Sequence, residues 1–330
     1  MKFKWFIGID ISKKTLDVSF YDNQGFKNSN HIKVNNNEKG FIEIIKWLKN
    51  NSITLDDVLI CMEHTDIYGI DLAVYLDKKA IAYSMVPPLH IKRSIGLSRG
   101  KNDKVDSFQI SRFCYLHREE LKLSKTPSKT IQKIKGLLNE RERLVKMQTV
   151  EKQVLTELKG ANTSSTLQRA ENRLKLFAND ISLIEKEMEQ AIEAEEDIYN
   201  NYTLIRSVIG IGMINAVLFI IYSNNFEGFT DARKYACYGG VAPFENTSGT
   251  SIRGKTRVSH LANKRIKANL SNGARSAVQN DPELRLYYDR KAKEGKEHGV
   301  IMNAIKFKLI TRVFAVVNRG TPFVKMRQAG

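Results

Sequence analysis

Apolar and polar positions along the first 118 residues follow the pattern of an α/β unit. The segments "KWFIGIDIS" and "KTLDVSFYD" are apolar and β-branched, and the short polar turn between them predicts an antiparallel hairpin. "FKNSNHIKV" can supply a third strand, and "NEKGFIEIIKWLKNN" has the apolar spacing of a helix capped by Asn36 or Asn37. Strands at "DVLICME" and "IAYSMVP", with helices at "DLAVYLDKK" and "DKVDSFQISRFCYLHREEL", complete the predicted order β-β-β-α-β-α-β-α.

The pattern changes between Pro127 and Asn200, where apolar residues recur among dense Lys, Glu and Arg. This spacing predicts two long helices broken at "KGANTSS" and arranged as an antiparallel coiled-coil arm. Such an arm is a spacer or an oligomerisation device. The remaining residues are predicted to be mainly helical around a glycine-rich middle. We therefore expect three domains, 1–125, 126–200 and 201–330.

Two features of the last domain each have two interpretations. Gly210-Ile211-Gly212 lies between apolar stretches. It is either a helix-hairpin-helix turn whose backbone N–H groups meet a phosphate, or a tight turn between two buried helices. Five aromatic residues either stack on unpaired bases of RNA or belong to the core: Phe226, Phe229, Tyr235, Tyr238 and Phe244.

Length and cysteine usage narrow the class of protein. A chain of 330 residues exceeds one ordinary core and points to two or three domains. The three cysteines form no C-x-x-C pair, which argues for a reducing compartment and against a disulfide framework or a cysteine-built zinc site. The apolar run at the N-terminus is too short for a signal peptide, and no run of about 18 apolar residues occurs. We therefore expect a soluble cytoplasmic protein.

Positive charge dominates the composition, with a formal net charge of +17. From Ile252 onward there are eighteen Lys or Arg against five Asp or Glu, a net charge of +13. A basic surface attracts polyanions, whose condensed counterions are released on binding. Nucleic acid is therefore the predicted partner, and no segment pairs this charge with an apolar membrane-anchoring face. A protein that is simply basic is the alternative.

Four acidic residues lie at positions that could bring their carboxylates together. Asp10 lies within the first apolar strand, and Glu63 closes the fourth strand in "LICMEHTD", where a charge is costly unless it is exposed, paired or bound to metal. Asp103 and Asp106 are three residues apart in "SRGKNDKVDSFQISRF", so on a helix they share one face. If the first and fourth strands are neighbours and the last helix packs across them, all four acids meet.

A cluster of four carboxylates repels itself and persists only with cations. Two divalent ions about 3.5 to 4 Å apart can bridge such carboxylates and act on a phosphate. Oxygen ligands without nearby Cys or His favour Mg²⁺ or Mn²⁺ over zinc. The alternative for the helical pair is that Asp103 caps the helix and Asp106 lies near its positive end.

The stretch "FENTSGTSIRGKTRVSH" contains a serine beside a glycine, Ser248. A serine hydroxyl is a poor nucleophile unless a base, a metal or a strong positive charge assists it. Alternate basic residues follow it in an extended segment and can hold a phosphate: Arg253, Lys255 and Arg257. Taken alone, the residue is equally well explained as an exposed turn serine.

Further basic residues border these two candidate sites. Lys13, Lys101 and Lys104 lie beside the predicted acid cluster, where they either steer phosphates or are solvated charges without a role. Lys264, Arg265 and Lys267 begin a helix after Asn263 and are suited to contacts with a nucleic-acid backbone.

The segments "IGIDISKKTLDVSFYD", "CMEHTDIYG", "SRGKNDKVDSFQISRFC", "IRSVIGIG", "FTDARKYACYGGVAPFENTSGTSIRG" and "SHLANKRIKANLSNGA" together resemble the DEDD insertion-sequence transposases related to the Piv invertase, described as bridge-RNA-guided recombinases. The resemblance covers nearly the whole chain in the family's order. It implies an N-terminal RuvC-like (RNase H-like) domain whose acidic tetrad is Asp10, Glu63, Asp103 and Asp106.

The resemblance also implies a C-terminal transposase domain in which Ser248 is the nucleophile. In the family that serine forms a covalent phosphoserine link to DNA, assisted by the metal-bound tetrad of another protomer. A composite site of this kind needs a homo-oligomer, either a dimer or a tetramer. A structured non-coding bridge RNA pairs with donor and target DNA and so selects the sites.

Three functions remain in competition at the level of the sequence. The first is an RNA-guided DNA recombinase that uses Ser248 with help from the tetrad. The second is a metal-dependent nuclease or junction resolvase that uses the tetrad alone. The third is an RNA-binding or architectural protein without chemistry.

Overall fold

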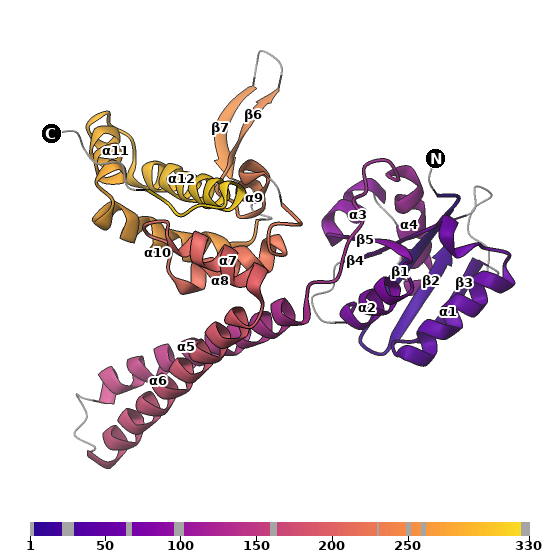
Figure 1. The fold of residues 1–330 in the computed structure, drawn as a ribbon, viewed down its shortest axis with the longest axis horizontal. Helices are drawn as coiled ribbons and strands as arrows, with labels where there is room; N and C mark the ends of the chain where they lie inside the picture. Colours follow the sequence, from indigo (N-terminus) through magenta and orange to yellow (C-terminus); the bar gives the residue numbers. More distant parts are fainter. Residues whose placement is uncertain are drawn as a thin grey trace. The chain divides into compact units, whose positions relative to one another are not determined.

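A five-stranded mixed sheet forms the centre of the N-terminal part of the chain in the computed structural model (Figure 1). The structure describes residues 3–21, 30–63, 68–95, 102–158, 164–229, 231–248, 252–258 and 262–324. Contacts divide the chain into two compact units, Met1–Thr126 and Pro127–Gly330. Across the described ranges, no helix is long and apolar enough to span a membrane.

The sheet has the strand order β3-β2-β1-β4-β5. Its strands are β1 (Trp5–Ile11), β2 (Thr15–Phe20), β3 (His31–Asn35), β4 (Val58–Glu63) and β5 (Ala82–Val86). β1 pairs with β2 in antiparallel fashion and with β4 in parallel fashion. The predicted hairpin is therefore confirmed, and so is the condition that the first and fourth strands are neighbours.

Helices cover both faces of this sheet, and the alternation of each strand decides which residues meet them. They are α1 (Glu38–Asn50), α2 (Ile70–Lys78), α3 (Pro88–Ile95) and α4 (Asp103–Leu116), with a short 3₁₀ turn at Leu55–Asp57. Ile7 and Ile9 of β1 pack with α1 and α2 on one face, whereas Phe6 packs with α3 and α4 on the other. Each fully buried isoleucine contributes about 1.5–3 kcal/mol to the free energy of unfolding.

Gly8 sets how closely α4 approaches β1. A Cβ atom at Gly8 would lie 2.1 Å from the Ser107 carbonyl oxygen and 2.2 Å from the Ser111 nitrogen, so only glycine fits there. Beside this contact, the Ser19 and Ser107 hydroxyl oxygens are 2.7 Å apart in a buried hydrogen bond between β2 and α4. The beginning of α4 is thereby held directly over β1 and β2.

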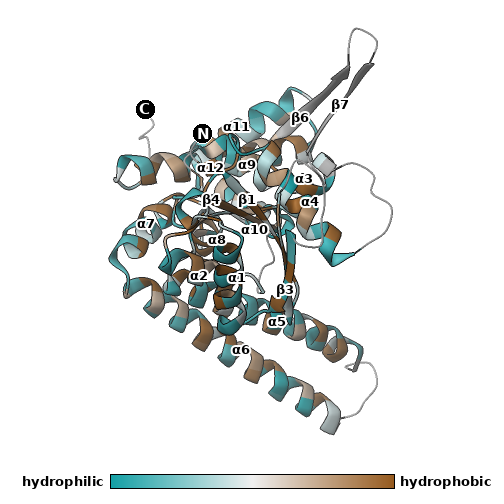
Figure 2. Cartoon of the chain, turned by 90° about the vertical axis from the view of Figure 1, so that its right-hand side faces the viewer, coloured by the Kyte–Doolittle hydropathy of each residue, from teal (hydrophilic) through white to brown (hydrophobic). Residues whose placement is uncertain are grey.

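The second unit begins with two long helices, α5 (Lys129–Leu158) and α6 (Ser164–Glu193). Arg141 pairs with Glu185 at 2.6 Å and Arg173 pairs with Glu151 at 2.6 Å. Because residue numbers rise on α5 as their partners' numbers fall on α6, the two helices run antiparallel. Apolar bands alternate with polar ones along both helices (Figure 2). The supercoiled packing of a coiled coil stays a prediction.

The rest of the second unit is mostly helical, as predicted. It contains α7 (Glu196–Arg206), α8 (Met213–Ser223), α9 (Ala232–Tyr238), α10 (Lys264–Asn280), α11 (Pro282–Lys293) and α12 (His298–Arg319), with one hairpin of β6 (Pro243–Ser248) and β7 (Ile252–Val258). The base of the arm shares its core, because Ile134 of α5 and Met188 of α6 are buried with residues of α8 and α12. The arm and the C-terminal helices therefore form one unit by contacts, and the three-part division stays a prediction.

Candidate active site

The N-terminus of α4 carries two of the predicted acids toward the sheet. Asn102 caps the helix, and its side chain accepts a hydrogen bond from the Lys104 backbone N–H at 3.1 Å. Asp103 is thus the first residue of the helix and not its cap, and Asp106 lies in the first turn. Both carboxylates lie at the positive end of the helix dipole, which stabilises their charge.

A row of charged residues crosses the sheet on the face that α4 covers. The register pairs Asp10 of β1 with Asp17 of β2, and Asp17 with Lys33 of β3. Ile9 pairs with Met62, so the next residue of β4, Glu63, lies level with Asp10. We call Glu63, Asp10, Asp17 and Lys33 the charged row. Three carboxylates and one ammonium therefore lie side by side on one face.

The pKa of Asp10 is shifted by its burial and by the neighbouring carboxylates. Burial first, and then the negative charges of Glu63, Asp106 and Asp103, raise the pKa of Asp10 to about 6. Each neighbour raises the pKa because a second negative charge disfavours ionisation of the first. The structure thus brings three separate chain segments close enough for their carboxylates to act on one another.

The donor set suits a hard divalent cation, since all four predicted ligands offer carboxylate oxygens. Within the residues that the structure describes, however, no three His, Cys, Asp or Glu side chains are close enough together to hold one ion. Asp103 in particular has a side chain that is 65% exposed and pairs with Lys33 at 3.6 Å. The four acids border one region without converging as ligands.

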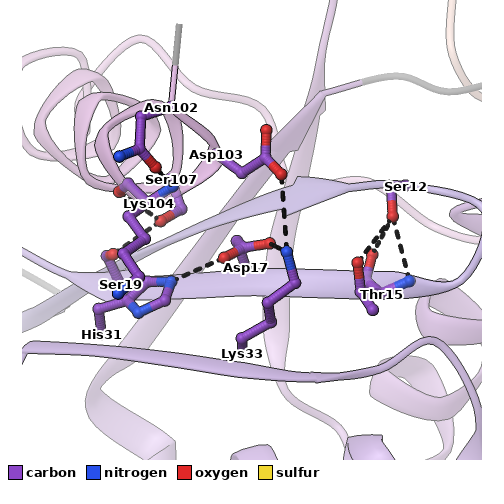
Figure 3. A network of polar contacts seen from close by, with 10 residues as sticks. All are labelled: Ser12, Thr15, Asp17, Ser19, His31, Lys33, Asn102, Asp103, Lys104 and Ser107. Carbon is purple, nitrogen blue, oxygen red and sulfur yellow. Dashed lines mark hydrogen bonds and ion pairs between the residues drawn. The ribbon is translucent and has the colours of Figure 1, made fainter.

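A polar network joins Asp103 to the buried edge of the sheet (Figure 3). Lys33 Nζ lies 3.1 Å from Asp17 Oδ2 and 3.6 Å from Asp103 Oδ2. The other oxygen of Asp17 accepts from His31 Nε2 at 2.9 Å. The side chains of His31 and Asp17 are 6% and 4% exposed, whereas that of Lys33 is 48% exposed. The hydrogen bond to Asp17 raises the pKa of Lys33.

Asp17, His31 and Lys33 were not among the residues that the sequence pattern singled out. The signal for Asp17 was present, because it interrupts the apolar run of "KTLDVSF" just as Asp10 interrupts that of "FIGIDI". The two aspartates differ in their partners. Asp17 is buried and doubly paired, whereas in the described part of the chain Asp10 has neither a hydrogen bond nor an ion pair.

Ser248 is the last residue of β6 and lies opposite Ile252 at the end of a hairpin (Figure 1). Its three following residues, 249–251, lie outside the described residues. Arg253, Lys255 and Arg257 occupy alternate positions of β7, which agrees with the predicted extended segment. That Ser248 is a nucleophile and that these basic residues bind phosphate stay predictions.

The remaining predicted basic residues have different surroundings. Lys13, Lys104 and Lys264 are exposed, and Lys101 lies outside the described residues. Lys267 is half-buried on α10. Arg265 instead pairs with Glu142 of α5 at 2.5 Å and donates to Asn139 at 2.9 Å, so its guanidinium fastens the arm to α10. This geometry supports a structural role for Arg265, and its contact with nucleic acid stays a prediction.

The turn at Gly210-Ile211-Gly212 joins α7 to α8 and packs against α10. A Cβ at Gly210, whose φ is +91°, would lie 2.6 Å from the Gly273 carbonyl oxygen. The turn also borders a hollow of about 340 Å³ together with Asn215, Asn272 and Ser276. Close packing explains the glycines, so the geometry supports the tight turn, and phosphate contact stays a prediction.

Three of the five aromatic residues belong to the core. Tyr235 is fully buried, and Phe226 and Phe229 pack against the same apolar cluster. Tyr238 is 40% exposed, and Phe244 lies among residues whose side chains are not described. Stacking on bases is therefore open only to Tyr238 among the four described side chains.

Comparisons with known proteins match most of the chain. Residues 7–159 match a family described as "Transposase", and residues 202–289 match the family "Transposase IS116/IS110/IS902 family". The pilin gene-inverting proteins of Moraxella lacunata and Moraxella bovis are each 26% identical over 326 residues, covering 98% of both chains. The IS110 uncharacterized 43.6 kDa protein of Streptomyces coelicolor is 28% identical over 143 residues, 43% of this chain and 35% of its own.

Proposed function

We propose that this chain, whose similarities support an IS110-family transposase, cuts and rejoins DNA strands with a serine nucleophile and a metal-assisted acidic site. The observation that carries the proposal is that Asp10, Glu63 and the first turn of α4 lie on the same face of the sheet. A relative named for inverting a gene supports rejoining as well as cutting, because inversion of a DNA segment requires both.

The proposed step conserves the number of phosphodiester bonds. The Ser248 oxygen bonds to the phosphorus while the bond from phosphorus to one bridging sugar oxygen breaks. The serine proton leaves to a base, and the departing sugar oxygen takes up a proton. A hydroxyl of another strand then attacks the phosphoserine and releases the serine, which rejoins DNA without an external energy source.

The acidic residues would contribute by holding divalent metal near the phosphate. Bound Mg²⁺ or Mn²⁺ would stabilise charge on the attacking and leaving oxygens. Asp10 and Glu63 are set by strand register and Asp103 and Asp106 by the helix, so all four oxygen donors come from rigid elements. The net charge of +17 would hold the phosphate backbone.

Two partners belong to the proposal. A structured bridge RNA would choose donor and target sites, as the family resemblance implies. A second copy of the chain would complete the site, and the arm offers a surface for it. Apolar side chains of the arm are exposed in the single chain: Met147 46%, Val150 59%, Leu176 62% and Leu183 55%.

The proposal is tested by trapping the covalent intermediate. Full-length protein would be incubated with its RNA, donor and target DNA and Mg²⁺, then denatured and analysed for DNA attached to protein. We expect an adduct whose modified peptide contains Ser248, and none in Ser248→Ala. Ser251→Ala, three residues further along the sequence, is the matched control and should retain the adduct.

Omission of the RNA separates guidance from chemistry. If guidance by RNA is required, the adduct disappears without RNA and returns with it. An adduct of equal yield without RNA would remove the guide from the proposal and leave the serine chemistry in place.

A second function is favoured by one specific observation. The acidic site is built entirely within the first unit, whereas Ser248 belongs to the second. A metal-dependent nuclease or junction resolvase needs only the first. Cleaved DNA with free ends, no adduct, and full cleavage by Ser248→Ala would favour that function over the recombinase.

A further inference from the structure

We propose that Lys33 is a positioning residue of the acidic site, serving as its built-in counter-ion and competing with a divalent cation for Asp103. This inference rests on the proposed function, in which Asp103 is a metal ligand. It concerns a residue on β3, far in the sequence from each of the four predicted ligands.

The position of Lys33 is set by two independent constraints. Strand register places it at the end of the charged row, opposite Asp17. Its ammonium is then held by a contact of 3.1 Å to the buried Asp17 carboxylate. Asp17 is in turn fixed by His31, so the anchor is a buried pair that does not depend on the exposed site.

The ammonium reaches from this anchor to Asp103. The two groups are 3.6 Å apart, and Asp103 is largely exposed at the first turn of α4 (Figure 3). An exposed carboxylate at a helix end has several side-chain rotamers, and a fixed cation beside it selects those that point toward β3. Lys33 therefore draws Asp103 to the β3 side of the charged row.

Several carboxylates lie around the ammonium of Lys33. Asp10, Asp17 and Glu63 lie in one row, and Asp103 and Asp106 face them from the helix. Like charges at this spacing repel one another. Within the described residues, Lys33 is the lysine that ion-pairs both with the row and with α4.

A divalent cation and the Lys33 ammonium are both drawn to the carboxylate of Asp103. The ammonium raises the positive potential where the cation would bind, so it weakens that binding. Removing its charge should therefore tighten binding of the cation. Damage to the fold would have the opposite effect, which makes the direction of the change diagnostic.

The experiment measures binding of Mn²⁺ to the full-length protein by isothermal titration calorimetry, without nucleic acid. We expect Lys33→Met to bind Mn²⁺ about fivefold more tightly than the wild type, an order of magnitude set by one charge in a partly solvated site. Lys33→Gln, which keeps a donor for Asp17, should tighten binding to a similar extent. Lys33→Arg keeps the charge and should stay within about twofold of the wild type.

Lys4→Met is the matched control. Lys4 also forms an exposed ion pair in the first unit, with Asp57 at 3.0 Å, but it precedes β1 at the end opposite Asp10. Its loss changes the net charge equally and should leave Mn²⁺ affinity unchanged. Asp103→Asn should weaken binding, and in that variant the further change Lys33→Met should no longer alter the Mn²⁺ affinity.

The outcomes separate the inference from the proposed function. Wild-type protein without saturable Mn²⁺ binding overturns the metal role of the acids and the inference with it. Saturable binding that Lys33→Met and Lys33→Gln leave unchanged or weaken overturns the inference alone. Equal tightening by Lys4→Met also overturns it, because the effect would then be one of net charge.

Discussion

Asp10→Asn should stabilise the first unit in the absence of divalent cations. Burial and neighbouring carboxylates raise the pKa of Asp10 from 3.8 to about 6. A raised pKa means that the folded state favours the protonated carboxyl. This contribution to the free energy of unfolding is fully present below about pH 4 and is lost as the pH rises through about 6. At about pH 8 the ionised carboxylate is therefore a cost, which the uncharged amide removes.

The magnitude follows from the pKa change. A shift of about two pKa units corresponds to about 3 kcal/mol for a group shielded from water. Asp10 is only half-buried, so solvent screening reduces this figure to about 1 kcal/mol. We expect Asp10→Asn to raise the free energy of unfolding by that amount at about pH 8, and by progressively less as the pH falls toward about 4.

Tryptophan fluorescence isolates the relevant unit. The chain has two tryptophans, Trp5 and Trp47, and both pack against Phe20 in the first unit. Urea unfolding of the full-length protein in a chelator, followed by this fluorescence, reports the first unit alone. Asp10→Asn that is less stable than the wild type at about pH 8 would refute the reasoning.

Asp17→Asn is the matched control, because it removes the same charge from the neighbouring position of the row. Its carboxylate is buried and accepts from the buried His31 and the half-exposed Lys33, whereas an asparagine offers one acceptor oxygen and turns its NH2 toward one of these two donors. We expect a destabilisation of about 1–3 kcal/mol. Equal effects of the two substitutions would mean that the structure does not distinguish the two aspartates.

Three other substitutions test the packing. Gly8→Ala places a methyl group against the Ser107 carbonyl and should destabilise the first unit by about 1–3 kcal/mol in the same fluorescence assay; an unchanged midpoint would contradict the close contact. Arg265→Met leaves Glu142 unpaired and should cost about 1–2 kcal/mol when helix unfolding is followed by circular dichroism, and a specific loss of nucleic-acid affinity without destabilisation would contradict the structural role. Burial lowers the pKa of Lys306, which means that its charged form is disfavoured in the folded protein. Lys306→Met removes that charge and should raise the midpoint of thermal unfolding by about 2–4 °C, and a lower midpoint would contradict this.

Local pattern was sufficient for the strands and for the acids on them. Apolar runs located β1 and β4, and an acid inside or at the end of such a run marked Asp10 and Glu63. Alternation within a strand also places a residue on one face of the sheet. The pairing of β1 with β4 was a condition that the sequence could state and that the structure meets.

The register between neighbouring strands could not be predicted from the local sequence pattern. Lys33 and Asp17 lie on different strands, and only the pairing of β2 with β3 places the two side by side. Pairing between strands is set by turns and by contacts distant in sequence, which a single-sequence pattern does not contain. For the same reason Arg265 looked like a surface cation, since its partner Glu142 lies on another helix.

The two prolines after β5 have two structural effects. The strand predicted at "IAYSMVP" ends at Val86, directly before Pro87 and Pro88. Pro88 also begins α3, because its fixed φ suits the first position of a helix and its missing N–H is not needed there. The prolines that follow β5 therefore also lead into α3, a helix that the sequence pattern does not predict.

The two aspartates of the charged row show how a fold gives neighbouring acids different surroundings. They are direct partners in the register, so they share the same face and the same helix above them. Asp17 is buried, ion-pairs with Lys33 and is hydrogen-bonded to His31, so both of its carboxylate oxygens are engaged. Burial and neighbouring carboxylates raise the pKa of Asp10 to about 6 and so disfavour its charge, and a divalent cation would offset that repulsion. A paired acid and an acid among like charges can therefore lie at adjacent positions of the charged row. Lys33 pairs with Asp17 and not with Asp10, because it lies on the strand beside Asp17.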